Sequence, residues 1–159
     1  MVMATGRGVA DRRVAGHGVI KRLLAERRDM LVLFCQVAGL DPFDCGAAEC
    51  DMLQSFCEIL VDYMAAAHFS LYRRLIDGSE RRQAVVALGA EIYGRIEACT
   101  ETAVQFNDKY AKSGEPADAA DLHADLSALG EAIATRIELE DRLIAALAGG
   151  AQAARSSDA

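Results

Sequence analysis

The sequence predicts an all-α protein, folded as an antiparallel four-helix bundle with short connections. Strong helix breakers are few and widely spaced, and Pro42 and Pro116 are the only prolines. The stretches between the breaks are rich in Ala, Leu, Arg and Glu, which are good helix formers. No stretch alternates apolar and polar residues as a half-buried strand would. Long helices joined by short connections pack side by side in antiparallel order.

Four breaks set the bounds of the predicted helices. They are "GLDPFDCG" (39–46), "IDGS" (76–79), "KSGEPAD" (112–118) and the pair Gly149-Gly150. The predicted helices are 17–38, 47–76, 80–111 and 117–148. The third contains Gly89 and Gly94, which each cost up to about 1 kcal/mol relative to alanine, so a kink or a split there stays open. We expect one domain over 17–148, a flexible tail at 1–16 and a disordered tail at 149–159.

Composition points to a cytoplasmic protein with one core. The chain has 159 residues, enough for a single hydrophobic core, and no uninterrupted run of 18 apolar residues that would span a membrane. Its N-terminal residues lack the apolar block of a secretory signal. The five cysteines form no C-x-x-C motif, which favours free thiols in a reducing compartment. Cys35, Cys57 and Cys99 fall in helical patterns as small core residues, while the role of Cys45 and Cys50 is open.

Charge is distributed unevenly along the chain. Residues 1–28 carry seven basic and two acidic residues, whereas the rest carries ten basic and twenty-two acidic residues. An acidic body repels phosphate groups, so direct binding to nucleic acid is not expected. The same acidity suits a basic partner, although it also serves solubility alone.

Enzyme and metal motifs are missing from the sequence. It contains no G-x-x-x-x-G-K-[ST], no G-x-G-x-x-G and no G-x-S-x-G. The three histidines fall on three different predicted helices, and no E-x-x-H pair of a di-iron bundle occurs. We therefore predict no enzyme activity, no bound metal and no other cofactor.

Glu140 falls within the apolar stripe of the last predicted helix. A buried carboxylate must be paired or neutral. It serves either as a ligand or acid, or as a structural core pair with Arg27, His68 or a tyrosine hydroxyl as donor, and we favour the structural pair. His68 is expected to be buried or half-buried, and Tyr63 and Tyr72 to lie at edges of the core with wet hydroxyls.

Phe69 stands out on the second predicted helix because it falls opposite the core stripe. At about 100° per residue, that stripe consists of Leu53, Cys57, Leu60, Met64, Ala67, Leu71 and Leu75. Phe69 instead shares its face with Glu58, Asp62 and Ala66. An aromatic side chain beside a charge on a rigid helix is typical of a protein-binding hot spot. From the residues alone, packing of Phe69 against the N-terminal helix or tail is equally open.

The same segment resembles a known family. "FCEILVDYMAAAHFSLYRRL" (56–75) is similar to the signature of the Rsd/AlgQ family of anti-sigma factors. "VIKRLLAERRDMLVLFCQVAG" (19–39), "FNDKY" (106–110) and "ATRIELEDRLI" (134–144) also resemble it, so the similarity covers nearly the whole chain. Membership implies a helical bundle that binds the primary sigma factor of bacterial RNA polymerase. The expected contact is the basic C-terminal region of sigma, which reads the −35 promoter element.

The resemblance also implies which residues bind the partner. Asp62 matches an aspartate expected to pair with a sigma arginine, and Phe69 matches an aromatic that inserts into the partner. Ala66 and Ser70 are expected on the same face, with Glu58 one turn before Asp62. Arg27 and Leu31 of the first helix are expected to line the rest of the groove.

Some questions stay open at the level of sequence. Arg73 stands where the family tends to be acidic, and Leu23 where it has an aromatic residue, which leaves the affinity for the partner undetermined. Two alternatives are a metal- or ligand-binding bundle centred on Glu140 and His68, and an acidic adaptor for another regulatory protein. Monomer and weak homodimer are both compatible with an exposed Phe69.

Overall fold

The computed structural model is all-α, as predicted, and describes residues 6–39, 47–111 and 119–156. These residues form four long helices and contain no strand. The helices and shorter helical segments are α1 (Gly6–Ala38), α2 (Ala47–Ala67), the π-helical turn η1 (His68–Tyr72), α3 (Arg73–Ile76), α4 (Gln83–Tyr110) and α5 (Ala119–Ser156). The segments α2, η1 and α3 follow one another directly, so together they correspond to the second predicted helix.

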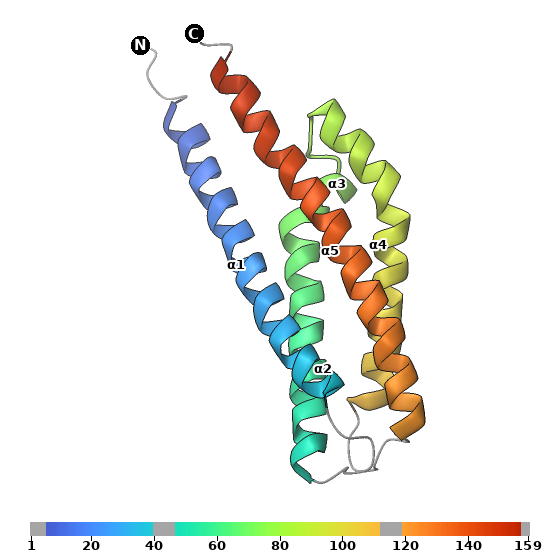
Figure 1. Ribbon diagram of the computed structural model, residues 1–159. Coiled ribbons are helices and arrows are strands. Elements are labelled where there is room, and N and C mark those ends of the chain that lie inside the picture. Colours follow the sequence, from blue (N-terminus) through green and yellow to red (C-terminus); the bar gives the residue numbers. More distant parts are fainter. Residues whose placement is uncertain (1–5, 40–46, 112–118, 157–159) are drawn as a thin grey trace.

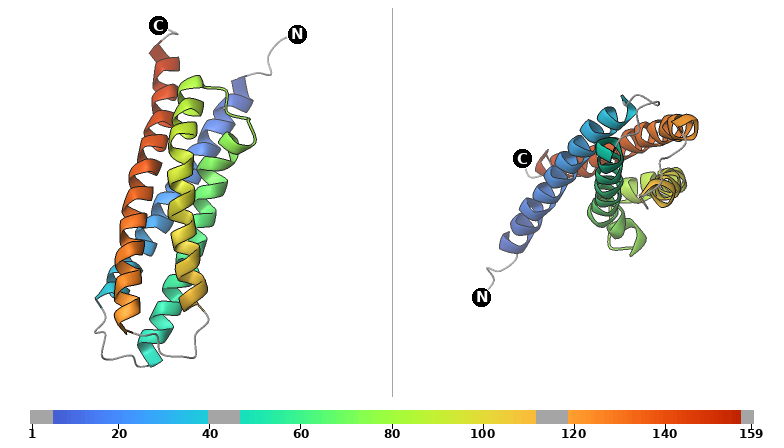
Figure 2. Two further views of the ribbon diagram at one scale, coloured as in Figure 1. Left: turned by 90° about the vertical axis from the view of Figure 1, so that its right-hand side faces the viewer. Right: turned by 90° about the horizontal axis from the view of Figure 1, so that it is seen from below.

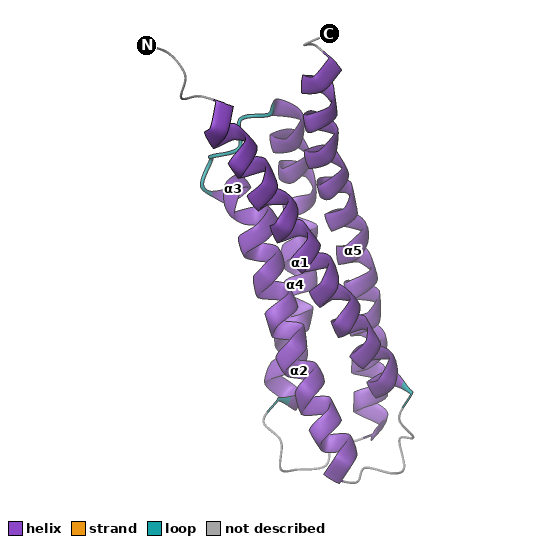
Figure 3. Cartoon of the chain, turned by 90° about the vertical axis from the view of Figure 1, so that its left-hand side faces the viewer, coloured by secondary structure: helices purple, strands orange, loops and turns teal. Residues whose placement is uncertain are grey.

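The four long helices pack as an up-and-down bundle (Figures 1 and 3). Helix α2 packs against α1 on one side and α4 on the other, and α5 packs mainly against α4. The beginning of α1 and the end of α5 lie at the same end of the bundle but point apart (Figure 2). The turn η1 contacts α1 and α5 as well as α2, which places it against the middle of the bundle.

An aromatic cluster joins three helices in the core. The ring of Phe56 on α2 lies 5.8 Å from that of Phe34 on α1 and 5.9 Å from that of Phe106 on α4. Phe106 in turn packs 4.6 Å from Tyr110. Tilted and edge-on rings at these distances are favourable beyond the area they bury. The cluster therefore fixes α1, α2 and α4 relative to one another.

The glycines of the third predicted helix do not split it. Helix α4 is continuous from Gln83 to Tyr110. Gly89 is buried, and a Cβ atom there would lie 2.8 Å from the side chain of Leu75. The missing side chain thus allows α3 to approach α4 closely. The irregular turn lies in the second helix instead, and Gly78 ends that helix with φ of +73°, a conformation that favours glycine.

Both outer helices extend further than the sequence predicted. Helix α1 begins at Gly6 rather than at residue 17, and α5 continues to Ser156 rather than ending at residue 148. Gly16, Gly18 and the pair Gly149-Gly150 are poor helix formers but do not forbid a helix, and alanine and arginine around them favour one. The helical backbone therefore includes most of both segments that we predicted to be tails, while the domain bounds themselves remain a prediction.

Candidate protein-binding surface

The outer face of α2 and η1 exposes an aromatic anchor beside carboxylates. The Phe69 side chain is 65% exposed, more than any other large hydrophobic side chain that is exposed in the described residues. Asp62 and Glu58 are exposed on the same helix. Neither carboxylate has an ion-pair partner among the residues that the structure describes. We call Glu58, Asp62, Ala66, Phe69 and Ser70 the Asp62–Phe69 surface.

Ala66 and Ser70 form the less exposed edge of this surface. Both are partly buried. The Ser70 hydroxyl donates a hydrogen bond to the backbone carbonyl of Ala66, four residues earlier. That bond occupies the hydroxyl proton, so Ser70 offers a partner mainly its oxygen lone pairs. The small side chains leave room around the Phe69 ring.

The expectation that His68 is buried or half-buried is wrong. His68 is exposed, and its ring packs edge-on against that of Phe69, with 5.3 Å between the centroids. His68 is the first residue of the π-helical turn, in which the N–H of Arg73 bonds to the carbonyl of His68, five residues earlier. The wider turn reduces the rotation between successive side chains, so the error of a regular helical wheel grows toward the end of the turn.

The π turn also explains why Tyr72 is not an edge residue. Leu71 and Tyr72 are neighbours in sequence, yet both are only 2% exposed. Tyr63, on the regular part of α2, is fully buried as well. Both tyrosines donate their hydroxyl hydrogen to the carboxylate of Glu140 on α5. The predicted wet hydroxyls of Tyr63 and Tyr72 are therefore wrong.

Glu140 is the centre of a buried polar network, as the structural interpretation of the sequence predicted. Its Oε2 accepts from Tyr63 and, at 3.0 Å, from Arg27 Nη2. Its Oε1 accepts from Tyr72 at 3.2 Å and from Arg136 Nε at 2.7 Å. Two guanidinium groups and two hydroxyls compensate for the burial of the charge. The sequence did not indicate that Arg136 belongs to this network. It showed only that Arg136 and Glu140 have i,i+4 spacing.

Arg27 belongs to this network and not to an open groove. It is 8% exposed and also donates to Asp141 Oδ1 at 2.6 Å. Burial alone would lower its pKa, but the hydrogen bonds to Asp141 and Glu140 raise the pKa above its ordinary value. Leu31, one turn further along α1, is partly buried against the core. Arg27 therefore stabilises the inner side of the bundle, and its proposed contact with a partner would need the network to open.

The network also fixes the protonation of its tyrosines. Burial, followed by the negative charge of Glu140, raises the pKa of Tyr63 and of Tyr72 well above the usual value for a phenol. Both hydroxyls therefore stay protonated at neutral pH and remain hydrogen-bond donors. Glu140 and His68 do not meet, since one is buried among four donors and the other lies on the surface. The structure thus gives no support to a ligand site built from these two residues.

The described cysteines include two buried thiols. Cys57 and Cys99 are buried, as predicted for small core residues, and burial raises the pKa of the Cys57 thiol to about 11. Cys35 is exposed and Cys50 is partly buried, so the core position predicted for Cys35 is wrong. Cys45 lies outside the described residues. A thiol with a raised pKa is a poor nucleophile, which makes Cys57 a structural residue.

Residues 6–39, 47–111 and 119–156 contain neither a membrane-spanning helix nor a cluster of metal-ligating side chains. None of these helices is long and apolar enough to cross a membrane. No three or more His, Cys, Asp or Glu residues in that part of the chain are grouped so that they could hold a metal ion.

Comparison with known proteins identifies the family. Residues 3–148 match the family model described as regulator of RNA polymerase sigma(70) subunit, Rsd/AlgQ. The chain is 34% identical over 152 residues to "Regulator of sigma D" of Yersinia pseudotuberculosis, covering 92% of this chain and 90% of that protein. It is also 34% identical over 139 residues to the protein of the same name from Escherichia coli, covering 83% and 85% of the two chains. No solved structure gives a significant match. The chain belongs to the Rsd/AlgQ family of regulators of the RNA polymerase sigma(70) subunit.

Proposed function

We propose that this protein is an anti-sigma factor that binds the primary sigma factor through the Asp62–Phe69 surface. The observation that carries the proposal is Phe69, an exposed aromatic ring beside Asp62 on a long helix of a sigma-regulator family member. An aromatic side chain placed on a rigid element loses little conformational entropy when it becomes buried in a partner. The role is regulatory and requires no catalysis.

We assign the contact to the C-terminal region of sigma, which reads the −35 promoter element. That region is basic because it contacts DNA phosphates, and this protein has a net charge of −7. The exposed carboxylates Asp62 and Glu58 have no basic partner in the described part of the chain, so they are free to pair with arginine or lysine. A complex formed here prevents sigma from binding both core polymerase and promoter. Such a complex belongs in the bacterial cytoplasm.

Arg73 limits how far this attraction extends. It is exposed on α3, one turn beyond Phe69, and it opposes a basic partner locally. We therefore place the centre of the interface between Asp62 and Phe69, with Arg73 at its edge. A one-to-one complex of a monomer is the simplest arrangement, and a weak homodimer through Phe69 would compete with it.

A competition assay tests this function. The C-terminal domain of the primary sigma factor is bound to a fluorescent duplex with the −35 element, and the protein is added. We expect the protein to release the DNA, and the Asp62→Asn and Phe69→Ala variants to fail to do so. Asp108→Asn and Val86→Ala, changes at exposed positions of α4, serve as matched controls that retain activity. If all four variants release DNA like the unmodified protein, the Asp62–Phe69 surface is not the interface.

A further inference from the structure

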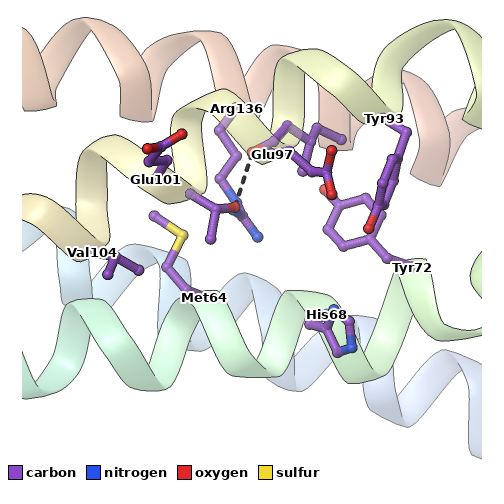
Figure 4. A pocket seen from close by; sticks show the side chains of 10 residues that line it. Met64, His68, Tyr72, Tyr93, Glu97, Glu101, Val104 and Arg136 are labelled. Carbon is purple, nitrogen blue, oxygen red and sulfur yellow. Dashed lines mark hydrogen bonds between the residues drawn. The ribbon is translucent and has the colours of Figure 1, made fainter.

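A cleft opens between α2, η1 and α4 (Figure 4), and Asp62 is not among the residues that line it. Its volume is about 570 Å³, within the range of small-molecule sites. Met64, Ile96 and Val104 supply apolar walls, and His68 lies at the η1 side. Arg136 reaches the cleft from α5 behind it. The cleft is therefore built by three of the long helices together with the π turn.

The floor of the cleft holds a buried guanidinium with unused donor capacity. Arg136 is 1% exposed, and its Nε donates to Glu140 while Nη1 donates to the Thr100 hydroxyl, the bond dashed in Figure 4. The remaining terminal nitrogen, Nη2, makes no hydrogen bond within the described residues and is not fully buried, so it is open to the cleft. Figure 4 shows the guanidinium directed into the cleft. A carboxylate oxygen placed there would complete its hydrogen bonding with a charge-assisted bond.

The rim of the cleft carries the opposite charge. Glu97 and Glu101 are both exposed, line the cleft and lie one turn apart on α4. Glu101 accepts a 3.3 Å hydrogen bond from Gln105, and Glu97 interacts with the Tyr93 hydroxyl. Neither carboxylate forms an ion pair within the part of the chain that the structure describes. Two neighbouring carboxylates favour a cationic group between them.

We propose that this cleft binds a small zwitterion, with its carboxylate at Arg136 and its ammonium group between Glu97 and Glu101. Such a molecule is complementary to both charges, while its apolar middle packs against Met64, Ile96 and Val104. A simple anion would be repelled by the rim, and a simple cation would leave the Arg136 donors without an acceptor. The site does not depend on sigma binding, and it lies next to that surface through the contact of His68 with Phe69.

A three-ligand NMR titration tests the charge pattern on the full-length protein. The probes are 6-aminohexanoate, which carries both charges, and hexanoate and hexylamine, which each carry one. We expect 6-aminohexanoate to shift the amide signals of Met64, His68, Glu97 and Glu101 saturably. We also expect it to bind about tenfold more tightly than either single-charge analogue, a difference of about 1.4 kcal/mol, because each analogue lacks one of the two ion pairs. Absence of shifts with 6-aminohexanoate into the tens of millimolar would overturn the proposal.

Variants at the rim separate specific binding from general charge effects. The double change Glu97→Gln and Glu101→Gln should reduce the affinity for 6-aminohexanoate to that of hexanoate. Glu131→Gln, an exposed position on α5 outside the cleft, should leave it unchanged. The role of Arg136 is tested by comparing ligands, because replacing this buried residue would destabilise the fold. If hexylamine binds as tightly as 6-aminohexanoate, Arg136 takes no part and the zwitterion assignment is wrong.

Discussion

The Phe69 side chain lies on the surface, where an aromatic ring adds little to the stability of the monomer. It is 65% exposed, so most of the free energy available from burying its ring is not realised within the chain. The His68 ring packs edge-on against it, and the nearby residues Ala66 and Ser70 have small side chains. The proposed interface with a partner would bury this ring.

Replacing Phe69 should separate binding from stability. Phe69→Ala should change the free energy of unfolding by no more than about 0.5 kcal/mol, because the ring makes few core contacts. It should weaken sigma binding by about 2 kcal/mol or more, roughly thirtyfold. Urea denaturation and calorimetric titration of the same samples measure the two effects. A variant that is markedly less stable would show that Phe69 belongs to the core.

Glu140 should behave in the opposite way, since it is fully buried and holds two cations. Glu140→Ala leaves Arg27 and Arg136 without their shared carboxylate and should cost about 3–5 kcal/mol of unfolding free energy. Glu138→Ala, at an exposed position two residues earlier on the same helix, is the control and should cost little. Equal destabilisation of the two variants in guanidinium chloride would contradict the buried network.

At the level of elements, the π turn η1 connects the buried network to the proposed interface. Tyr72 at its end donates to Glu140, while Phe69 within it points to the surface. Turns of this kind are rare and are often found at functional sites. The hydrogen bond of Tyr72 therefore anchors the segment that presents Phe69.

The two tyrosines of the network offer a matched comparison. Tyr63→Phe and Tyr72→Phe each remove one hydroxyl donor to Glu140, so both should lower stability by about 0.5–1.5 kcal/mol. Only Tyr72 lies in η1, so only Tyr72→Phe should also weaken sigma binding, by about two- to tenfold. Calorimetric titration of both variants decides this. Equal affinities would mean that the π turn holds Phe69 without help from Tyr72.

The regular helices were predictable from sequence because their signals are local. The helix-forming stretches lie between breaks at Gly78 and at the two prolines. These signals predicted the order of the four helices. The exposed Phe69 and buried Glu140 followed from a helical wheel, since both positions depend mainly on angle along one helix. The extension of α1 to Gly6 was missed, because glycine lowers helix propensity without preventing a helix.

The error at Tyr72 follows from the π turn. A wheel assumes constant rotation per residue, and the π turn changes that rotation between His68 and Tyr72. No residue type in "HFSLY" marks such a turn. In the sequence, Arg136 was notable only for its i,i+4 spacing from Glu140. Its burial between Tyr63 and Tyr72 depends on three helices meeting, which one helix alone does not reveal.

At the level of the whole molecule, the network around Glu140 links α1, α2, η1 and α5. In the unfolded chain tyrosine loses its proton near pH 10, whereas burial keeps Tyr63 and Tyr72 protonated in the folded protein. Above that pH the unfolded state binds fewer protons than the folded state, so the free energy of unfolding falls as pH rises. The loss of these two tyrosines' contribution begins near pH 10 and grows as pH increases.

Alkaline denaturation measures this coupling. We expect the urea midpoint of the unmodified protein to fall between about pH 9 and pH 11, and to fall less in the double variant Tyr63→Phe and Tyr72→Phe. The double variant starts from lower stability at neutral pH because Glu140 has lost two donors. An identical pH dependence in both proteins would show that these tyrosines ionise freely in the folded state.

The acidic body and the exposed Phe69 together support our proposal that this protein binds the basic C-terminal region of the primary sigma factor. Calorimetric titration of the protein with that domain, from the same organism and at two salt concentrations, tests it most directly. We predict one-to-one binding that is stronger at the lower salt concentration, because salt screens the attraction between exposed charges. Absence of binding at both salt concentrations would contradict the claim and would show that the family fold serves another partner here.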